Sequence, residues 1–242
     1  MRLVVIFFVL FFSALAHAAG SSVGSIGRIL KKFQETLGAC DCELSALNRE
    51  AGERAMGQAS LKDVHGKNIP VTVMNDEFAL KMFQEMTVQK KIPFGFPEDG
   101  CYARAHEMAV QLEKKKIYTA KVFATGKFRV DAQKAARGSV TWGFHVAPVI
   151  IVDDGKSRRL WVIDPSLFYE PTSLETWLET LTSHEKSELK SVFLTSRFIF
   201  HPSHRDKQLT TFDPDDLLTT KRIMDRYLKT DDRRTKRALD NI

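Results

Sequence analysis

The sequence predicts an α+β fold, because strand-like segments are grouped together between helical ones rather than alternating with them. The chain of 242 residues is 43% apolar and 27% charged, which supports a buried core and excludes a disordered or collagen-like polymer. Two of the strand-like segments are joined by a short polar turn, as in a hairpin, which favours an antiparallel sheet. We find no internal repeat.

Residues 1–18 have the pattern of a cleavable export signal. An apolar run from Leu3 to Phe12 follows Arg2 and precedes a small-residue cleavage site at 16–18 (AHA). The run is shorter than the roughly 20 residues that span a bilayer, so we expect no stable membrane association after cleavage. Residues 37–40 (LGAC) resemble a lipoprotein box but lack the apolar segment before it. The pattern predicts a secreted protein, either extracellular or periplasmic.

The mature chain divides into three parts. Residues 19–66 begin with a helical repeat of apolar side chains and continue as a polar stretch, so they form either a pro-segment or an N-terminal helical layer. Residues 67–228 hold most of the strand and helix patterns and are the predicted catalytic domain. Residues 229–242 alternate charges of both signs without apolar support, which is typical of a frayed, charged tail.

The helix and strand patterns of the central domain can be placed in order. Asn75 caps a helix that follows the apolar run 69–74, and a breaker-rich loop at 93–100 leads into a second helix that opens at Cys101. The expected later elements are strands at 118–125, 139–152, 159–164 and 191–200, a capping box at 172–175 that starts a helix, and a last helix from Pro214.

Cys101 is the first candidate catalytic residue. The chain has three cysteines, an odd number, so at least one thiol has no partner within the chain. A thiol is a good nucleophile only as thiolate, and a helix N-terminus favours that form. The N–H groups of the same first turn are candidate donors to the oxyanion that forms when sulfur attacks a carbonyl.

His145 and Asp164 are the candidate base and orienting acid. His145 alternates with Ala147 on one face of an apolar strand, where a histidine needs a hydrogen-bond partner. Asp164 closes the next strand, and the hairpin register decides whether the two share a face. A four-residue loop sets them directly opposite, a six-residue loop makes them diagonal neighbours about 7–8 Å apart at Cα, and an odd loop separates them.

Three segments resemble the bacterial secreted protein-glutaminases, also called protein-glutamine deamidases: 99–108 (DGCYARAHEM), 142–147 (WGFHVA) and 163–168 (IDPSLF). The resemblance implies a papain- and transglutaminase-like core, with the helix that bears the nucleophile packed on an antiparallel sheet. It also implies a triad of Cys101, His145 and Asp164.

The family hydrolyses the side-chain amide of glutamine in proteins and peptides through a thioester, releases ammonia and needs no cofactor. Its members are exported with a pro-region that covers the cleft, which makes 19–66 a candidate inhibitory segment. The family's mature enzymes are rich in disulfides, whereas this chain has only Cys40 and Cys42 besides Cys101.

Other functions use the same residues or different ones. A cysteine protease or a transglutaminase would need the same triad, and an inactive secreted binding module would carry it without using it. A metal site at His201 and His204 with Asp206 is disfavoured, because these residues lie in a loop. The mildly basic charge is not clustered, which argues against nucleic-acid binding. We expect a monomer that acts on exposed glutamine, and His106 lies too far around its helix from Cys101 to join the triad.

Overall fold

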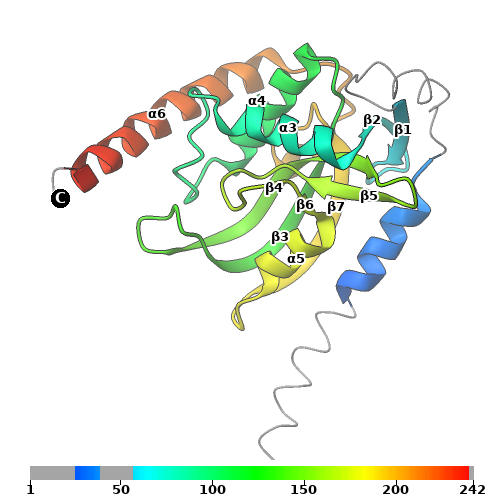
Figure 1. The fold of residues 1–242 in the computed structure, drawn as a ribbon, viewed down its shortest axis with the longest axis horizontal. Helices are drawn as coiled ribbons and strands as arrows, with labels where there is room; N and C mark the ends of the chain where they lie inside the picture. The colour runs from blue at the N-terminus through cyan, green and yellow to red at the C-terminus, as the bar shows by residue number, and fades with distance from the viewer. Residues whose placement is uncertain (1–24, 39–56, 240–242) are drawn as a thin grey trace, which may run out of the picture.

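The structure is a computed structural model that describes residues 25–38 and 57–239 (Figure 1). One sheet contains β1 (Gly57–Lys62), β2 (Asn68–Met74), β3 (Ala120–Asp131), β4 (Ser139–Asp153), β5 (Arg158–Val162), β6 (Thr172–Ser173) and β7 (Glu188–Ser196). The helices are α3 (Asp76–Thr87), α4 (Cys101–Lys114), α5 (Leu174–Thr182) and α6 (Pro214–Leu239), with a 3₁₀ turn η1 (Pro202–His204) and a helical stretch at 25–35. The predicted α+β class is confirmed.

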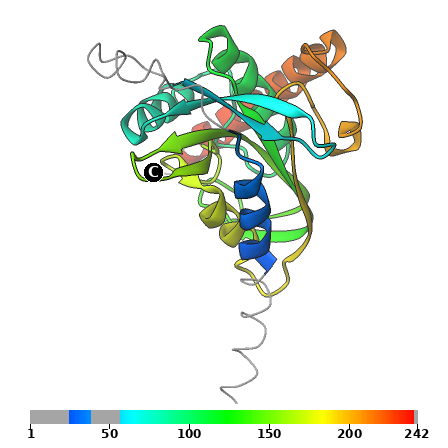
Figure 2. The same cartoon turned by 90° about the vertical axis from the view of Figure 1, so that its right-hand side faces the viewer.

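Helices cover both faces of the sheet (Figures 1 and 2). On one face, α3, α4 and α6 enclose an apolar cluster that includes Met82, Leu112, Ile150 and Met224. On the other face, α5 and the stretch 25–35 enclose a larger cluster. Its members from these two helices are Ile26, Phe33, Leu174, Trp177, Leu178 and Leu181. The sheet is therefore buried on both sides, and the residues of β4 alternate between the two clusters.

The sheet is antiparallel apart from one pair of strands. Its main order is β1-β2-β4-β3-β7, with β5 and β6 joined to β4. β2 runs parallel to β4, with Val73 opposite Ile151, whereas every other pairing in the described chain is antiparallel. The expected antiparallel core is thus present. β2 can run parallel to β4 because a long connection through α3, α4 and β3 lies between the two strands.

The hairpin between β4 and β5 has an even register. Val152 pairs with Arg159 and Val149 pairs with Val162, which is the register that the six-residue loop predicts. Within that span Asp153 also pairs with Arg158, and the Asp154 side chain accepts bonds from the Lys156 and Ser157 amides in the turn. His145 and Asp164 therefore lie on the same side of the sheet as diagonal neighbours.

The expected limits differ from the structure in several places, such as β3, which runs to Asp131 rather than to residue 125. Two of the differences have an identified cause. The last long strand, β7, ends at Ser196 rather than continuing to Phe200. The reason is that the Ile199 carbonyl accepts a hydrogen bond from the buried Lys121 side chain at 2.7 Å instead of joining a strand ladder. The segment 198–200 is apolar because it packs into the core, not because it is extended in the sheet.

The predicted frayed tail from residue 229 is the second difference, because α6 continues without a break to Leu239. Arg234 explains part of this: its guanidinium bonds Glu98 at 2.9 Å and lies over the Phe96 ring. The charged side chains of this turn thus have partners in another part of the fold, which a local sequence pattern does not reveal.

The predicted signal peptide and the two other cysteines, Cys40 and Cys42, lie outside the described residues. Within the described ranges, no helix is both long and apolar enough to cross a membrane. β1 pairs along its whole length with β2, so residues 57–62 are part of the central sheet.

Candidate active site

Cys101 is the first residue of α4, as the sequence predicts. The residue before it, Gly100, is the N-cap and has a left-handed backbone with φ of 78°, a conformation that glycine adopts at little cost. The Gly100 carbonyl accepts the first helical hydrogen bond, from the Arg104 amide at 3.0 Å. Cys101 is 6% exposed, and its thiol lies at the helix end where the amide N–H groups have no helical partner.

His145 and Asp164 are in direct contact. The His145 Nε2 atom lies 2.7 Å from Asp164 Oδ2, and both side chains are buried. His145 comes from β4, where it pairs with Ala124 of β3, and Asp164 follows the end of β5. The carboxylate is fixed further by the Ser166 amide at 3.3 Å and by Trp177 Nε1 at 3.1 Å.

The electrostatics of this pair favour a charged imidazole. Burial alone would lower the pKa of His145, but the Asp164 carboxylate, its hydrogen bond and the neighbouring Cys101 raise the pKa to about 9. For Asp164, burial acts to raise the pKa, and the charge and hydrogen bond of His145 outweigh it, so the pKa lies below its ordinary value. At neutral pH the pair is an imidazolium and a carboxylate.

Cys101 and His145 are brought together at the N-terminal end of α4. Nε2 of His145 is taken by Asp164, and Nδ1 has no other hydrogen-bond partner of standard geometry among the described residues. The neighbouring Cys101 side chain contributes to the raised pKa of His145. The three predicted site residues therefore form one connected group: thiol, imidazole and carboxylate.

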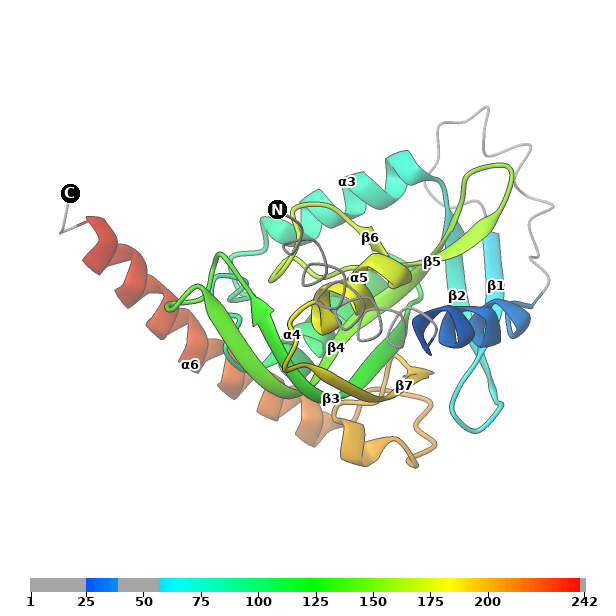
Figure 3. The ribbon, with the colours of Figure 1, turned by 90° about the horizontal axis from the view of Figure 1, so that it is seen from below.

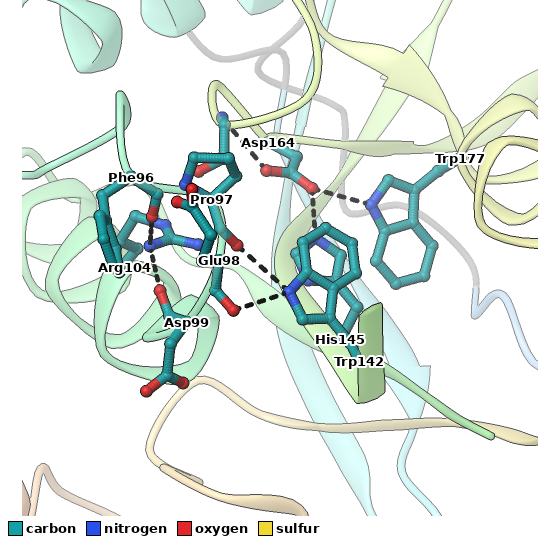
Figure 4. A network of polar contacts seen from close by, with 10 residues as sticks. Phe96, Pro97, Glu98, Asp99, Arg104, Trp142, His145, Asp164 and Trp177 are labelled. Atoms are coloured by element: carbon teal, nitrogen blue, oxygen red, sulfur yellow. Dashed lines mark hydrogen bonds and ion pairs between the residues drawn. The ribbon is translucent and has the colours of Figure 1, made fainter. Parts of the chain in front are cut away.

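Two tryptophans enclose the imidazole ring (Figure 4). Trp142 stacks on His145 with centroids 4.3 Å apart and an interplanar angle of 5°, and Trp177 lies on it at 5.6 Å and 24°. From the sequence, neither tryptophan was assigned a place beside the imidazole. The bond from Trp177 to Asp164 was missed, because nothing in the local pattern joins α5 to β5.

The other histidines considered from the sequence do not join this group. His201 bonds Ser203 at 2.8 Å, His204 faces Asp216 at 4.0 Å, and Asp206 lies near His65. In the ranges that the structure describes, no three His, Cys, Asp or Glu side chains are grouped so as to hold a metal ion. The loop site that the sequence analysis disfavoured is not among such groups in the described residues.

His106 is buried on another side of α4. Its Nδ1 atom lies 2.9 Å from the Lys121 ammonium nitrogen, and its ring packs edge-on against Phe200 and Phe212. Burial, with the neighbouring Lys121, lowers the pKa of His106 to about 2. The residue is a neutral partner for a buried lysine.

The comparisons with known proteins find a match over the part of the chain that contains this site. Residues 78–181 match the family model described as "Glutaminase", and this range contains all three predicted site residues. No curated protein matches the chain.

The solved structures that the chain resembles are protein-glutaminases. A pro-protein-glutaminase has 24% identity and a TM-score of 0.55, with 65% of this chain and 59% of that chain covered. A protein-glutaminase has 22% identity and a TM-score of 0.54, with 65% and 89% covered. The protein-glutaminase of Chryseobacterium proteolyticum has 24% identity and a TM-score of 0.53, with 64% and 88% covered.

The chain thus spans less than two thirds of the pro-forms and most of the shorter solved chains. At these identities the likeness establishes the fold, and the matching family model covers the segment that carries the site. Over residues 78–181, which are less than half of its length, the chain is similar to the glutaminase family.

Proposed function

We propose that the protein hydrolyses the side-chain amide of glutamine in proteins or peptides to glutamate and releases ammonia, with Cys101 as nucleophile. The observation that carries the proposal is the connected group of Cys101, His145 and Asp164 inside the segment that matches the glutaminase family. The solved protein-glutaminases of the same fold support the choice of protein-bound glutamine as substrate.

The first half of the reaction forms a thioester. His145 holds the proton of the Cys101 thiol as the imidazolium, and the sulfur attacks the γ-carboxamide carbon to give a tetrahedral oxyanion. Amide N–H groups at the start of α4 stabilise that oxyanion. The imidazolium then gives its proton to the leaving nitrogen, the C–N bond breaks, and ammonia departs.

The second half hydrolyses the thioester. His145 removes a proton from water, and the hydroxide adds to the thioester carbon. The intermediate then expels the Cys101 sulfur, which leaves glutamate and restores the thiol. Asp164 keeps Nδ1 of His145 directed toward the sulfur, since it bonds Nε2 on the other side of the ring.

One experiment separates this reaction from the others that use the same residues. The protein is incubated with a glutamine-rich protein such as casein, and ammonia is measured beside the intact mass of the substrate. Ammonia with unbroken, uncrosslinked substrate is the expected result, and Cys101→Ala abolishes it. Fragments would identify a protease, crosslinked products a transglutaminase, and no change in the substrate a binding module.

We propose also that the chain is exported and that residues 1–18 are removed as its signal. The residue pattern of this segment supports export. Intact mass of protein collected from the periplasm or medium tests it, and a mass that includes the first 18 residues contradicts it.

A second processing step after export is a separate question, because residues 19–66 resemble a pro-region only by position. The pairing of β1 with β2 and the burial of Ile26 and Phe33 favour their retention as a layer of the domain. The same mass measurement decides this, since loss of the segment would leave a chain that starts near residue 67.

A further inference from the structure

The loop before Cys101 has four consecutive carbonyls that are held by two buried side chains (Figure 4). Arg104 Nη1 donates to the carbonyls of Phe96 at 2.8 Å and Asp99 at 2.6 Å. Trp142 Nε1 donates to the carbonyls of Pro97 and Glu98, each at 3.2 Å. The backbone that leads into the nucleophile is thus fixed at every residue from 96 to 99.

Arg104 is an unusual residue for this position. It is 2% exposed and lies on α4 one turn after Cys101. Among the described residues, no carboxylate forms an ion pair with it within 4.0 Å, and its Nη2 atom is buried without a hydrogen-bond partner. Burial lowers the pKa of Arg104, and the nearby Cys101, Asp164 and Asp99 act in the opposite direction without reversing the shift. Burying a cation without a direct ion pair is costly, so we look for a role that offsets this cost to stability.

The opposite side of the loop is held by α6. The Phe96 ring stacks on Tyr227 with centroids 4.5 Å apart, and Arg234 bonds Glu98. Gly100 lies so close to α6 that a Cβ atom there would be 2.7 Å from the Tyr227 ring. The loop is therefore clamped between α4 with β4 on the inside and α6 on the outside.

This clamp determines where the amide groups of the loop point. In a trans peptide the N–H lies opposite the preceding carbonyl. Since the carbonyls of Pro97, Glu98 and Asp99 face the two buried donors, the next three N–H groups face away from those donors. The left-handed Gly100 then turns the chain into α4, where the Cys101 N–H is one of the first-turn donors that a helix cannot use itself.

We propose that Arg104 and Trp142 are positioning residues that hold the 96–99 carbonyls and thereby aim the Cys101 amide at the oxyanion of the reaction. The inference rests on the proposed acyl transfer and names what orients its oxyanion donor. In this role neither side chain needs to touch the substrate. The Nη1 atom of Arg104 bridges two carbonyls three residues apart. A lysine side chain is shorter, so its ammonium group cannot fully replace this bridge.

The test compares two reactions of the same thiol. Deamidation needs the oxyanion donor, whereas alkylation of Cys101 by iodoacetamide forms no oxyanion. Arg104→Lys and Trp142→Phe are measured for kcat and KM of ammonia release and for the rate of Cys101 alkylation, read at the Cys101 peptide by mass spectrometry. Arg197→Met is the matched control, because Arg197 is also a buried arginine but bonds Glu113 at the far end of α4.

We expect kcat to fall about 10- to 100-fold in both variants, a loss somewhat below that of a deleted oxyanion donor. KM and the alkylation rate should stay within about threefold of wild type, since substrate contacts and the thiol–imidazole pair are retained. Arg197→Met should keep the wild-type kcat. Trp142→Phe keeps an aromatic ring against His145, so it tests the idea even where Arg104 variants fail to fold.

Two outcomes overturn the inference: an unchanged kcat in folded Trp142→Phe, or alkylation that falls in parallel with kcat. The second would mean that the two residues act on the thiol or imidazole instead. A wild-type protein that releases no ammonia would refute the proposed function, and this result is distinct from either.

Discussion

At the scale of single residues, the site depends on how Asp164 controls His145. The imidazole is buried between two aromatic rings, where it would ordinarily lose its proton, and the carboxylate reverses that tendency so that the pKa is about 9. A strong base in a dry environment suits removal of a thiol proton and its later delivery to a leaving amine.

Replacing Asp164 by Asn tests this control. The variant keeps an oxygen for Trp177 but loses the negative charge, so the pKa of His145 should fall and its ring should be less well oriented. We expect kcat to drop by about 10²- to 10⁴-fold, as in other triads. The alkaline limb of the pH–rate profile, near pH 9 in the wild type, should move to lower pH. A profile that keeps its alkaline limb would contradict the assigned pair.

The raised pKa of His145 also makes the stability of the fold depend on pH over a defined range. A folded-state pKa raised from 6.5 to about 9 means that the protonated His145 stabilises the fold fully below pH 6.5. That contribution is lost as the pH rises through 9. Urea unfolding between pH 6 and 10 should show a steeper alkaline decline in wild type than in Asp164→Asn.

His106 should give the opposite dependence of stability on pH. Its pKa is lowered to about 2 in the fold, so between pH 6.5 and 2 only the unfolded chain takes up this proton. Stability then falls with decreasing pH by about 1.4 kcal/mol per pH unit for one proton. His106→Asn keeps an acceptor for Lys121 without titrating, and its unfolding free energy should decline less between pH 6 and 4. Equal slopes would contradict the prediction.

The three predicted site residues could be proposed from sequence because each has a local signature. A breaker loop precedes Cys101, an apolar strand surrounds His145, and Asp164 ends its strand. Arg104 and Trp177 have no such signature, since their roles depend on partners brought close only by folding. Arg104 lies inside the motif that carried the family resemblance, yet the motif does not say which carbonyls it holds.

At the scale of elements, helix and strand starts were predicted well where a side chain or glycine defines them. Asn75 accepts the Phe78 amide at 2.8 Å as the cap of α3, and Pro214 is the first residue of α6. Element ends were predicted less well, because they depend on distant contacts: Lys121 takes the Ile199 carbonyl, and Arg234 finds Glu98. The triad hypothesis required an even hairpin loop, and the structure has the register of the six-residue loop.

Gly100→Ala tests the junction of loop and helix. A non-glycine residue at φ of 78° costs about 1–2 kcal/mol, and the new methyl group would also press on Tyr227. We expect a lower free energy of unfolding and reduced ammonia release. Tyr227→Ala removes the stack on Phe96 and so has a cost of its own. Urea unfolding of both single variants and the double variant separates the contact from the backbone strain, because only the strain remains when Gly100→Ala is made in the Tyr227→Ala chain. A Gly100→Ala change that costs nothing in that chain would show that the left-handed conformation carries no cost.

At the scale of the whole molecule, residues before 67 contribute to the core on the α5 side. Ile26, Phe33, Ala59 and Leu61 are all buried there. We predict that deleting residues 19–66 lowers the melting temperature or prevents folding, because it removes the edge strand β1 and a covering helix. The thermal unfolding curve and ammonia release of the truncated chain are the measurements. A stable, more active product would instead identify the segment as inhibitory.

The long reach of α6 has a mechanical consequence. The helix presses on the loop before Cys101 and then runs on past the body of the protein toward the C-terminus (Figure 3). A load applied to that end, by a fused domain or an optical trap, is transmitted along one stiff rod to the Tyr227 and Arg234 contacts before it reaches the sheet. Tension should therefore stop ammonia release at forces that leave the sheet intact. The C-terminus is then a poor attachment point for a tether, and the N-terminus is a better one.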